Sequence, residues 1–257
     1  MLHVSASAQN LRLETVARGL QNPWAVAFLP NGRFLVTERA GRLRVVELNG
    51  RLNKPVEGLP DVALGGQGGR LDVLLDTDFA INLTLYFCFS EPASIGNGNP
   101  QGATLAPDGT LWMHKHGPQG GGEINLPKPG VNYGWPVITY GENYGGGQIG
   151  AGLTAPAGLE QPLHYWTPSV APSGMAFLTS ECYGKAWQGN LFAGSLKFAY
   201  LNRIELTAPY SGKVQRESKL ISDVGERIRD VRQGPDGLLH VLTDSHNGKL
   251  IRLQPVP

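Results

Sequence analysis

The chain has 257 residues, of which 35 are glycine and 19 are proline, and charged residues make up only 17% of it. This balance favours many tight turns over long amphipathic helices, and the length suits one large domain with a buried core. The formal net charge of +1 excludes a global field that would recruit nucleic acid. No apolar run reaches the roughly 18–20 residues that cross a bilayer, so we expect no membrane span.

The N-terminal stretch is the first feature along the chain. Residues 4–9 show the small-residue alternation of a signal-peptide cleavage region. Residues 1–10 are therefore interpreted either as the remnant of an export signal or as a disordered N-terminus, and residues 11–257 as a single domain. The first alternative predicts a periplasmic or secreted protein.

A recurring unit follows, in which a short apolar strand leads through Pro-Asn/Asp-Gly into a second apolar strand. Its first copy spans residues 25–37, with the turn at 30–32, and continues into a third strand at 43–48. Further copies span 103–112 and 228–242, the latter followed by a strand at 250–253, and a degenerate copy runs from 175 to 206. Asn-Gly and Asp-Gly supply the positive φ of a hairpin turn, and the flanking alternation packs one sheet on the next.

Sheets repeated in this way predict an all-β fold, a β-propeller of four-stranded antiparallel blades. A β-sandwich also gives short strands and glycine turns, so it remains the alternative fold. Residues 117–144 are rich in Gly, Pro and Asn, which predicts a long surface loop rather than a core element. Cys88 and Cys182 could pair in an oxidising compartment, but their separation in sequence says little about their distance in space, so we predict no disulfide.

Seven short segments are individually weak but informative as an ordered set. They are Asn22-Pro23-Trp24-Ala25-Val26-Ala27-Phe28, Gly65-Gly66-Gln67-Gly68-Gly69, Asn99-Pro100-Gln101-Gly102, His116-Gly117-Pro118, Asn132-Tyr133-Gly134-Trp135-Pro136, Gly194-Ser195-Leu196-Lys197-Phe198 and Glu226-Arg227-Ile228-Arg229-Asp230. In this order the set resembles the soluble PQQ-dependent aldose (glucose/sorbosone) dehydrogenases. The resemblance implies a six-bladed propeller that holds PQQ and Ca²⁺, oxidises an aldose to a lactone by hydride transfer to the quinone, and passes electrons to an unidentified acceptor.

The three carboxylates of PQQ require fixed cations in the pocket, and guanidinium groups match carboxylate geometry well. Arg227, Arg229 and Lys197 meet that requirement. Arg227 and Arg229 are two residues apart, so on a strand they share a face and could clamp one flat anion. Without the resemblance, a solvated strand face with ordinary salt bridges is the simpler interpretation.

The resemblance also implies roles for residues in the loops. It implies cofactor hydrogen bonds for Gln67, Asn99 and Ser169, a place near the substrate mouth for Trp166, and the backbone calcium pair Gly117 and Pro118. Ca²⁺ accepts backbone carbonyl oxygens as ligands, so this pair suits it chemically. A His-x-His pattern at His114 and His116 could in principle bind zinc, but no third ligand is evident nearby.

One part of the family pattern is missing. The family's general base is a histidine in a His-x-Gly-Gly context upstream of Asn-Pro-Gln-Gly, and this chain has no histidine between His3 and His114. Gly98 also stands where the family pattern has an arginine. We therefore expect an internal deletion near residues 91–97, fewer or incomplete blades, and no assignable catalytic residue, since His164, His240 and His246 all suit structural positions.

Three functions are consistent with these features. The leading one is a PQQ-dependent sugar dehydrogenase whose activity is impaired by the missing segment. The alternative is a non-catalytic propeller that binds PQQ, a sugar or a protein partner. A calcium-dependent lactonase is disfavoured because the sequence lacks an evident carboxylate cluster for a catalytic calcium.

Overall fold

The computed structural model describes residues 10–62, 64, 70–76, 78–89, 100–117, 119–128, 131, 133, 138–149, 152–154 and 158–256. This part of the chain is almost entirely β-structure, with one short α-helix, α1 (Phe79–Asn82), and one 3-10 turn, η1 (Ser222–Val224). Among the described residues there is no helix long and apolar enough to cross a membrane.

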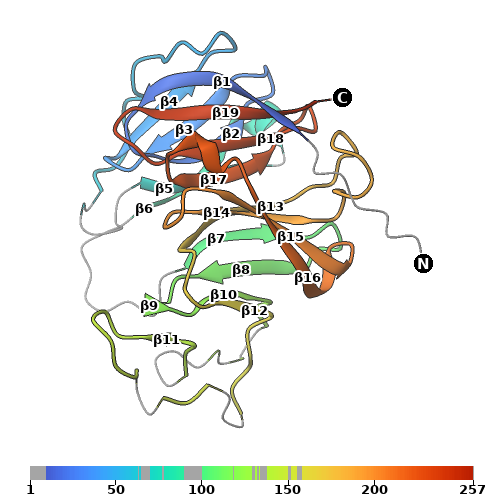
Figure 1. The fold of residues 1–257 in the computed structure, drawn as a ribbon. Helices are drawn as coiled ribbons and strands as arrows, with labels where there is room; N and C mark the ends of the chain where they lie inside the picture. Colours follow the sequence, from blue (N-terminus) through green and yellow to red (C-terminus); the bar gives the residue numbers. More distant parts are fainter. Residues whose placement is uncertain are drawn as a thin grey trace.

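Four sheets of three or four antiparallel strands form the blades of a propeller (Figure 1). Blade I is β2 (Pro23–Phe28), β3 (Phe34–Glu38) and β4 (Arg42–Val46). Blade II is β7 (Pro100–Leu105), β8 (Leu111–Lys115), β10 (Gly122–Asn125) and β12 (His164–Trp166). Blade III is β13 (Pro172–Phe177), β14 (Leu191–Ser195), β15 (Leu201–Ala208) and β16 (Ser211–Leu220). Blade IV is β17 (Ile228–Gln233), β18 (Leu239–Thr243), β19 (Gly248–Pro255) and the N-terminal strand β1 (Leu11–Leu20).

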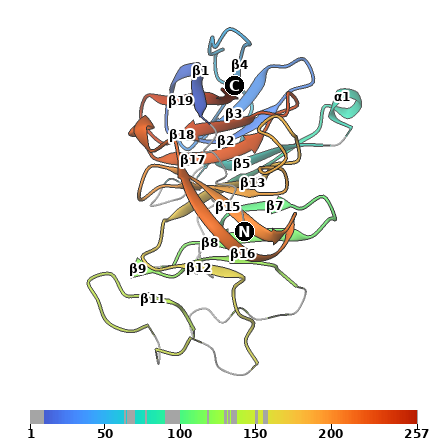
Figure 2. The ribbon, with the colours of Figure 1, turned by 45° about the vertical axis from the view of Figure 1, so that its right-hand side comes forward.

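Two smaller sheets complete the described structure. The half-blade, β5 (Arg70–Leu75) and β6 (Leu85–Phe89), follows blade I and carries α1 in its connection. A two-stranded ribbon of β9 (Gln119–Gly120) and β11 (Gly141–Glu142) extends from the loops of blade II. Figure 2 shows this ribbon and its loops at the far end of the molecule from blade IV.

Apolar clusters between neighbouring sheets form the core. One cluster joins blades II and III and contains Trp112 and Phe177, whose rings meet edge to face at 5.2 Å. Others join blade III to blade IV, blade IV to blade I, and blade I to the half-blade. Because each sheet covers one face of the next, burial of these faces drives the radial stacking, at roughly 25 cal/mol per Å² of apolar area.

The inner strands define a common axis. The first strand of each sheet contacts the next in the order β7, β13, β17, β2, β5, and all five line one cavity. They run in the same direction along the axis, so the loops at their starting ends gather on one face, here called the loop face. The predicted all-β propeller is confirmed.

The Pro-Asn/Asp-Gly turns have the expected geometry. Gly32, Gly109 and Gly237 have φ of +81°, +84° and +77°, a region that side chains rarely tolerate. In the second turn, the Asp108 carboxylate accepts the Thr110 N–H at 2.9 Å. Asn31 and Asp236 accept the equivalent N–H in the other two turns. The Asn/Asp side chain thus fixes each turn, and the glycine allows its handedness.

The two ends of the chain meet in blade IV. Strand β1 pairs antiparallel with β19, from Leu11 opposite Pro255 to Leu20 opposite Gly248, and Figure 1 shows them side by side. The last blade is therefore completed by the first strand of the domain.

The predicted loop over residues 117–144 is wrong for part of its length. Strand β10 pairs with β8 and β12, and its Ile124 side chain is fully buried. The sequence did not predict this strand, because the charged residue Glu123 occupies one of its core positions. That carboxylate is satisfied by the Lys115 ammonium at 2.6 Å, so its burial is tolerated.

Candidate functional site

A hollow of about 470 Å³ opens among the loops of blades II and III on the loop face. This loop-face hollow is lined by His116, Gly117, Gln119, Gly120, Tyr144, Pro168, Ser169, Ala171 and Lys197. Its volume lies within the roughly 300–1,000 Å³ typical of ligand pockets. Three predicted site residues, Gly117, Ser169 and Lys197, are thus brought together from segments distant in sequence.

Lys197 reaches the hollow from the turn between β14 and β15. The turn is held from below, because Ser195 Oγ donates to the carbonyl of Val170 at 2.8 Å and the N–H of Lys197 donates to the same oxygen at 3.2 Å. The Lys197 ammonium lies 5.2 Å from the centre of the Phe198 ring. Within the described chain no carboxylate forms an ion pair with it, which leaves a positioned cation for an external anion.

The segment before β13 forms another wall. Ser169 is buried, and its Oγ accepts the N–H of Ala171 at 3.1 Å, so its own O–H proton stays available for donation. His116 Nε2 lies 2.7 Å from the carbonyl oxygen of Pro172. Burial lowers the pKa of His116, an effect that this carbonyl partly opposes, so a neutral imidazole with its proton toward Pro172 fits the contact.

Arg227 and Arg229 do share a face, as their spacing predicts, but they already hold an anion from the protein. Their guanidinium groups lie 3.3 and 2.9 Å from the same oxygen, Oδ2 of Asp244. Burial alone would raise the pKa of Asp244, but Arg229 and, to a smaller extent, Arg227 lower it. Arg229 is also stacked on Trp24, with its guanidinium carbon 4.0 Å from the ring centre.

Arg229 is almost fully buried, and burial lowers its pKa while Asp244 opposes the effect. Its Nε has no hydrogen-bond partner in the described part of the molecule. Arg227 is half exposed. Neither arginine lines the loop-face hollow, but both charges act on His116, which does.

Gly117 occupies a crowded backbone position. A Cβ on this residue would lie 2.2 Å from the carbonyl oxygen of Gly120 and 2.5 Å from that of Gly121. Only glycine fits there, and the backbone oxygens around it are ligands of the kind that Ca²⁺ accepts. No group of three or more His, Cys, Asp or Glu suited to a metal occurs in the described ranges, so any cation here would rely on such oxygens.

The remaining predicted residues fall elsewhere. Trp166 is buried between blades II and III and donates from Nε1 to Glu217 at 2.8 Å, so it does not line the hollow. Gln67, Asn99 and Pro118 lie outside the described residues. His114, the other half of the His-x-His pattern, is fully buried beneath the loop face.

Sequence reasoning overlooked three residues near the site. Gln101 Oε1 lies 3.4 Å from Nη1 of Arg229 and belongs to the Asn-Pro-Gln-Gly segment that was noted in the sequence. Asp244 comes two residues after the predicted strand that ends at residue 242, and that position could have suggested a loop-face carboxylate. Tyr144 sits in a glycine-rich stretch and gave no signal, because its place depends on the ribbon of β9 and β11.

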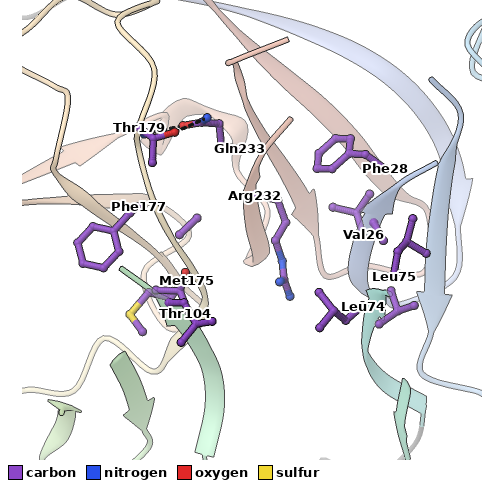
Figure 3. Close-up of a pocket in the computed structure, with 14 residues that line it drawn as sticks. Val26, Phe28, Leu74, Leu75, Thr104, Met175, Phe177, Thr179, Arg232 and Gln233 are labelled. Carbon is purple, nitrogen blue, oxygen red and sulfur yellow. Dashed lines mark hydrogen bonds between the residues drawn. The ribbon is translucent and has the colours of Figure 1, made fainter. Parts of the chain in front are cut away.

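A second cavity, of about 370 Å³, occupies the other end of the propeller axis. Figure 3 shows its apolar walls, including Val26, Leu75 and Phe177, with the Arg232 guanidinium projecting between them. Arg232 is neutralised by Asp72 at 2.7 Å and Asp230 at 3.0 Å. This axial cavity is separate from the loop-face hollow and shares no lining residue with it.

Known proteins resemble the chain along almost its whole length. The profile of the family described as Glucose / Sorbosone dehydrogenase matches residues 20–98 and 93–252. Aldose sugar dehydrogenase YliI of Escherichia coli (strain K12) is 32% identical over 355 aligned positions, which cover 97% of this chain and 94% of that protein.

Solved structures share the fold. The apo-form crystal structure of the soluble aldose sugar dehydrogenase from Escherichia coli superposes with a TM-score of 0.89 at 31% identity, covering 96% of this chain and 100% of that one. The PQQ-bound aldose sugar dehydrogenase from Streptomyces coelicolor gives a TM-score of 0.73 at 20% identity, covering 96% and 98%. At that identity the second likeness bears on the fold alone.

Proposed function

Because the chain belongs to the glucose/sorbosone dehydrogenase family, we propose that it is an oxidoreductase that binds PQQ and Ca²⁺ at its loop face and oxidises aldose sugars to lactones. The observation that carries the proposal is Lys197, whose backbone is bonded to Val170 at the edge of the hollow and whose exposed ammonium has no carboxylate partner in the described chain. A cation that lines a hollow without a carboxylate partner favours an anionic ligand there.

The residues present fit PQQ. Among the described residues, Lys197 supplies a cation without a carboxylate partner, Ser169 a hydroxyl donor, and Arg229 a buried Nε that lacks a hydrogen-bond partner. A tricarboxylate placed between the hollow and the arginines would gain charge-assisted hydrogen bonds from these groups. Asp244 limits the gain, because it already neutralises part of the arginine charge.

Calcium is proposed on narrower grounds. Gly117 brings its own backbone against the carbonyls of Gly120 and Gly121, and such oxygens suit a hard cation. Pro118, the second residue of the predicted pair, lies outside the described residues.

When bound, PQQ supplies a quinone that accepts the hydride from the sugar. The chain's own residues would orient the cofactor through Lys197 and Ser169 and keep its carboxylates neutralised. The proton of the sugar hydroxyl needs a base, and the sequence has no histidine where the family pattern places one. We therefore propose that the protein binds PQQ but oxidises the sugar slowly.

Titration of PQQ against the protein in the presence of Ca²⁺, followed by fluorescence quenching, tests the pocket. Lys197→Ala is expected to weaken PQQ binding by roughly 10- to 100-fold, the value of a charge-assisted hydrogen bond. Lys185→Ala is the matched control, because this lysine is exposed and does not line the hollow. Equal PQQ affinity in the two variants would remove Lys197 from the proposal.

A second candidate function follows from the missing histidine. The protein would then be a propeller that binds PQQ, a sugar or a protein partner without turnover. Reduction of an artificial acceptor dye by the PQQ-loaded protein with D-glucose separates the two candidates. Dye reduction supports the dehydrogenase, whereas tight PQQ binding without dye reduction supports the binding module.

We also propose that an internal segment was lost near residues 91–97. Two findings support this, namely that the family profile matches in two parts that meet at residues 93–98, and that the alignment with the E. coli relative spans 355 positions although this chain has 257 residues. We likewise propose that the protein is exported to the periplasm or outside the cell and that it passes its electrons to an external acceptor.

A further inference from the structure

Tyr144 is an exposed aromatic residue that the fold itself does not use. Its side chain is 82% exposed although it lines the loop-face hollow. In the described part of the chain its ring has no hydrogen-bond or aromatic partner. Large apolar surfaces in a binding hollow are usually covered when the ligand is present. The exposed ring is therefore a surface that a ligand can cover.

The backbone of Tyr144 is nevertheless held firmly. It lies in a turn closed by hydrogen bonds from the N–H of Asn143 to the carbonyl of Gly147 and from the N–H of Gly146 to the carbonyl of Asn143, both at 2.9 Å. The Asn143 amide donates to the carbonyl of Gln148 at 2.9 Å. These contacts hold the backbone that carries the ring at the rim and so reduce the backbone entropy lost when a ligand packs there.

The turn is also tied to the hollow directly. The N–H of Gly145 donates to Oε1 of Gln119 at 3.2 Å, and strands β9 and β11 pair beside it. Because Oε1 of Gln119 is used in this way, its side-chain NH₂ group remains as a donor on the wall of the same hollow in the described structure. The rim thus combines one aromatic face with a hydrogen-bond donor.

This combination matches a pyranose ring. A pyranose has an apolar C–H face and a polar edge of hydroxyl groups, so it packs its face on an aromatic ring and hydrogen-bonds at its edge. Among the described lining residues Tyr144 offers an exposed six-membered aromatic ring, whereas the His116 imidazole is bonded to Pro172 and the other members are small or polar. A flat tricarboxylate would instead be drawn toward Lys197 on another wall.

We propose that Tyr144 positions the aldose substrate by packing its ring against the sugar, with the Gln119 amide as a hydrogen-bond donor to a sugar hydroxyl. The inference rests on the proposed function, since it assigns the sugar to the same hollow. It adds a substrate-positioning residue in the turn after β11, distinct from the residues that would hold the cofactor.

Calorimetric titration of the PQQ-loaded protein with D-glucono-1,5-lactone, which cannot donate a hydride, measures sugar binding without turnover. Tyr144→Ala is expected to weaken lactone binding about five- to tenfold and to leave PQQ affinity unchanged, while Tyr144→Phe stays close to wild type. Tyr86→Ala is the control, because this tyrosine is also exposed but lies on β6, away from the hollow. If dye reduction is measurable, the Ala variant should raise KM for D-glucose with little change in kcat.

Two results would overturn the inference. One is a lactone affinity in Tyr144→Ala within twofold of wild type. The other is an equal loss of lactone affinity in Tyr144→Phe, which would assign the effect to the hydroxyl group. Failure of PQQ to bind would instead reject the proposed function. In that case saturation-transfer NMR with D-glucose on the cofactor-free protein decides the inference. Transfer that is lost in Tyr144→Ala but kept in Tyr144→Phe supports it, and transfer that is absent or unchanged rejects it.

Discussion

Lys197 and Arg229 were both predicted to bind carboxylates, yet their surroundings differ. Lys197 faces the hollow with no carboxylate partner in the described structure, whereas Arg229 is buried against Trp24 and paired with Asp244. A ligand can therefore gain the full charge of Lys197 but must share Arg229 with an internal carboxylate. Spacing in the sequence predicted that Arg227 and Arg229 share a face. It could not show that Asp244, fifteen residues away from Arg229, would reach that face.

Leu83 gives a test of backbone strain at a single residue. It ends α1 with φ of 54° and ψ of 25°, a left-handed conformation unfavourable for leucine, and its side chain is 73% exposed. Leu83→Asn should raise the free energy of unfolding in urea by roughly 0.5–1 kcal/mol, because asparagine adopts this conformation readily. Leu74→Asn is the control, since Leu74 is similarly exposed but lies within strand β5. A loss of stability equal to that of the control would show that the strain is negligible.

At the level of strands, the hairpins were predictable because their turn chemistry is local. The Pro-Asn/Asp-Gly turns depend on a side chain bonding two residues ahead, and sequence displays this directly. Strand β10 was not predictable, because Glu123 is tolerated in it only through Lys115 on β8. The loop-face hollow was likewise only partly predictable, since the ribbon of β9 and β11 pairs short glycine-rich segments with no apolar alternation.

Strand β8 also carries a titratable group that couples folding to pH. Burial lowers the pKa of His114 from 6.5 to about 3, with His116 adding to the effect. In the unfolded chain the imidazole takes up a proton near pH 6.5, whereas in the folded protein it rejects that proton until about pH 3. The stability contributed by neutral His114 is therefore fully present above pH 6.5 and is lost as pH falls, by up to about 1.4 kcal/mol per pH unit.

His114→Gln should reduce this pH dependence. Free energies of unfolding in urea between pH 4.5 and 7.5 should show a shallower slope for the variant, by the equivalent of about one proton. The variant will lose stability at pH 7, because Gly102 packs closely against the imidazole, so the slope is the decisive quantity. The pKa values of His116 and His240 are also lowered by burial. Both residues are present in both proteins, so their contributions to the slope cancel in the comparison. Identical slopes would mean that His114 is protonated equally in the folded and unfolded states.

For the whole molecule, the prediction of fewer or incomplete blades agrees with four blades and one half-blade among the described residues. The half-blade covers part of blade I through Val73 and its neighbours. It also leaves exposed apolar side chains at Leu74, Ile81 and Leu83. The sequence predicted the shortened ring from motifs that were missing. It could not predict how the remaining sheets are held around the axis, because that depends on contacts between strands distant in the chain.

One such contact is the ion pair between Arg232 on β17 and Asp72 on β5, at 2.7 Å. Arg232 keeps Asp230 as a second partner, and Asp230 in turn accepts the N–H of Val26 at 3.1 Å, so the group links blade IV, blade I and the half-blade.

Asp72→Ala leaves Arg232 paired and should loosen the half-blade selectively. Amide hydrogen exchange over residues 70–76 and 85–87 should speed up, while β17–β19 keep their protection. Asp78→Ala, which removes an exposed carboxylate beside α1 that makes no capping bond, is the control. Unchanged exchange in β5 and β6 relative to that control would show that apolar packing against blade I alone holds the half-blade.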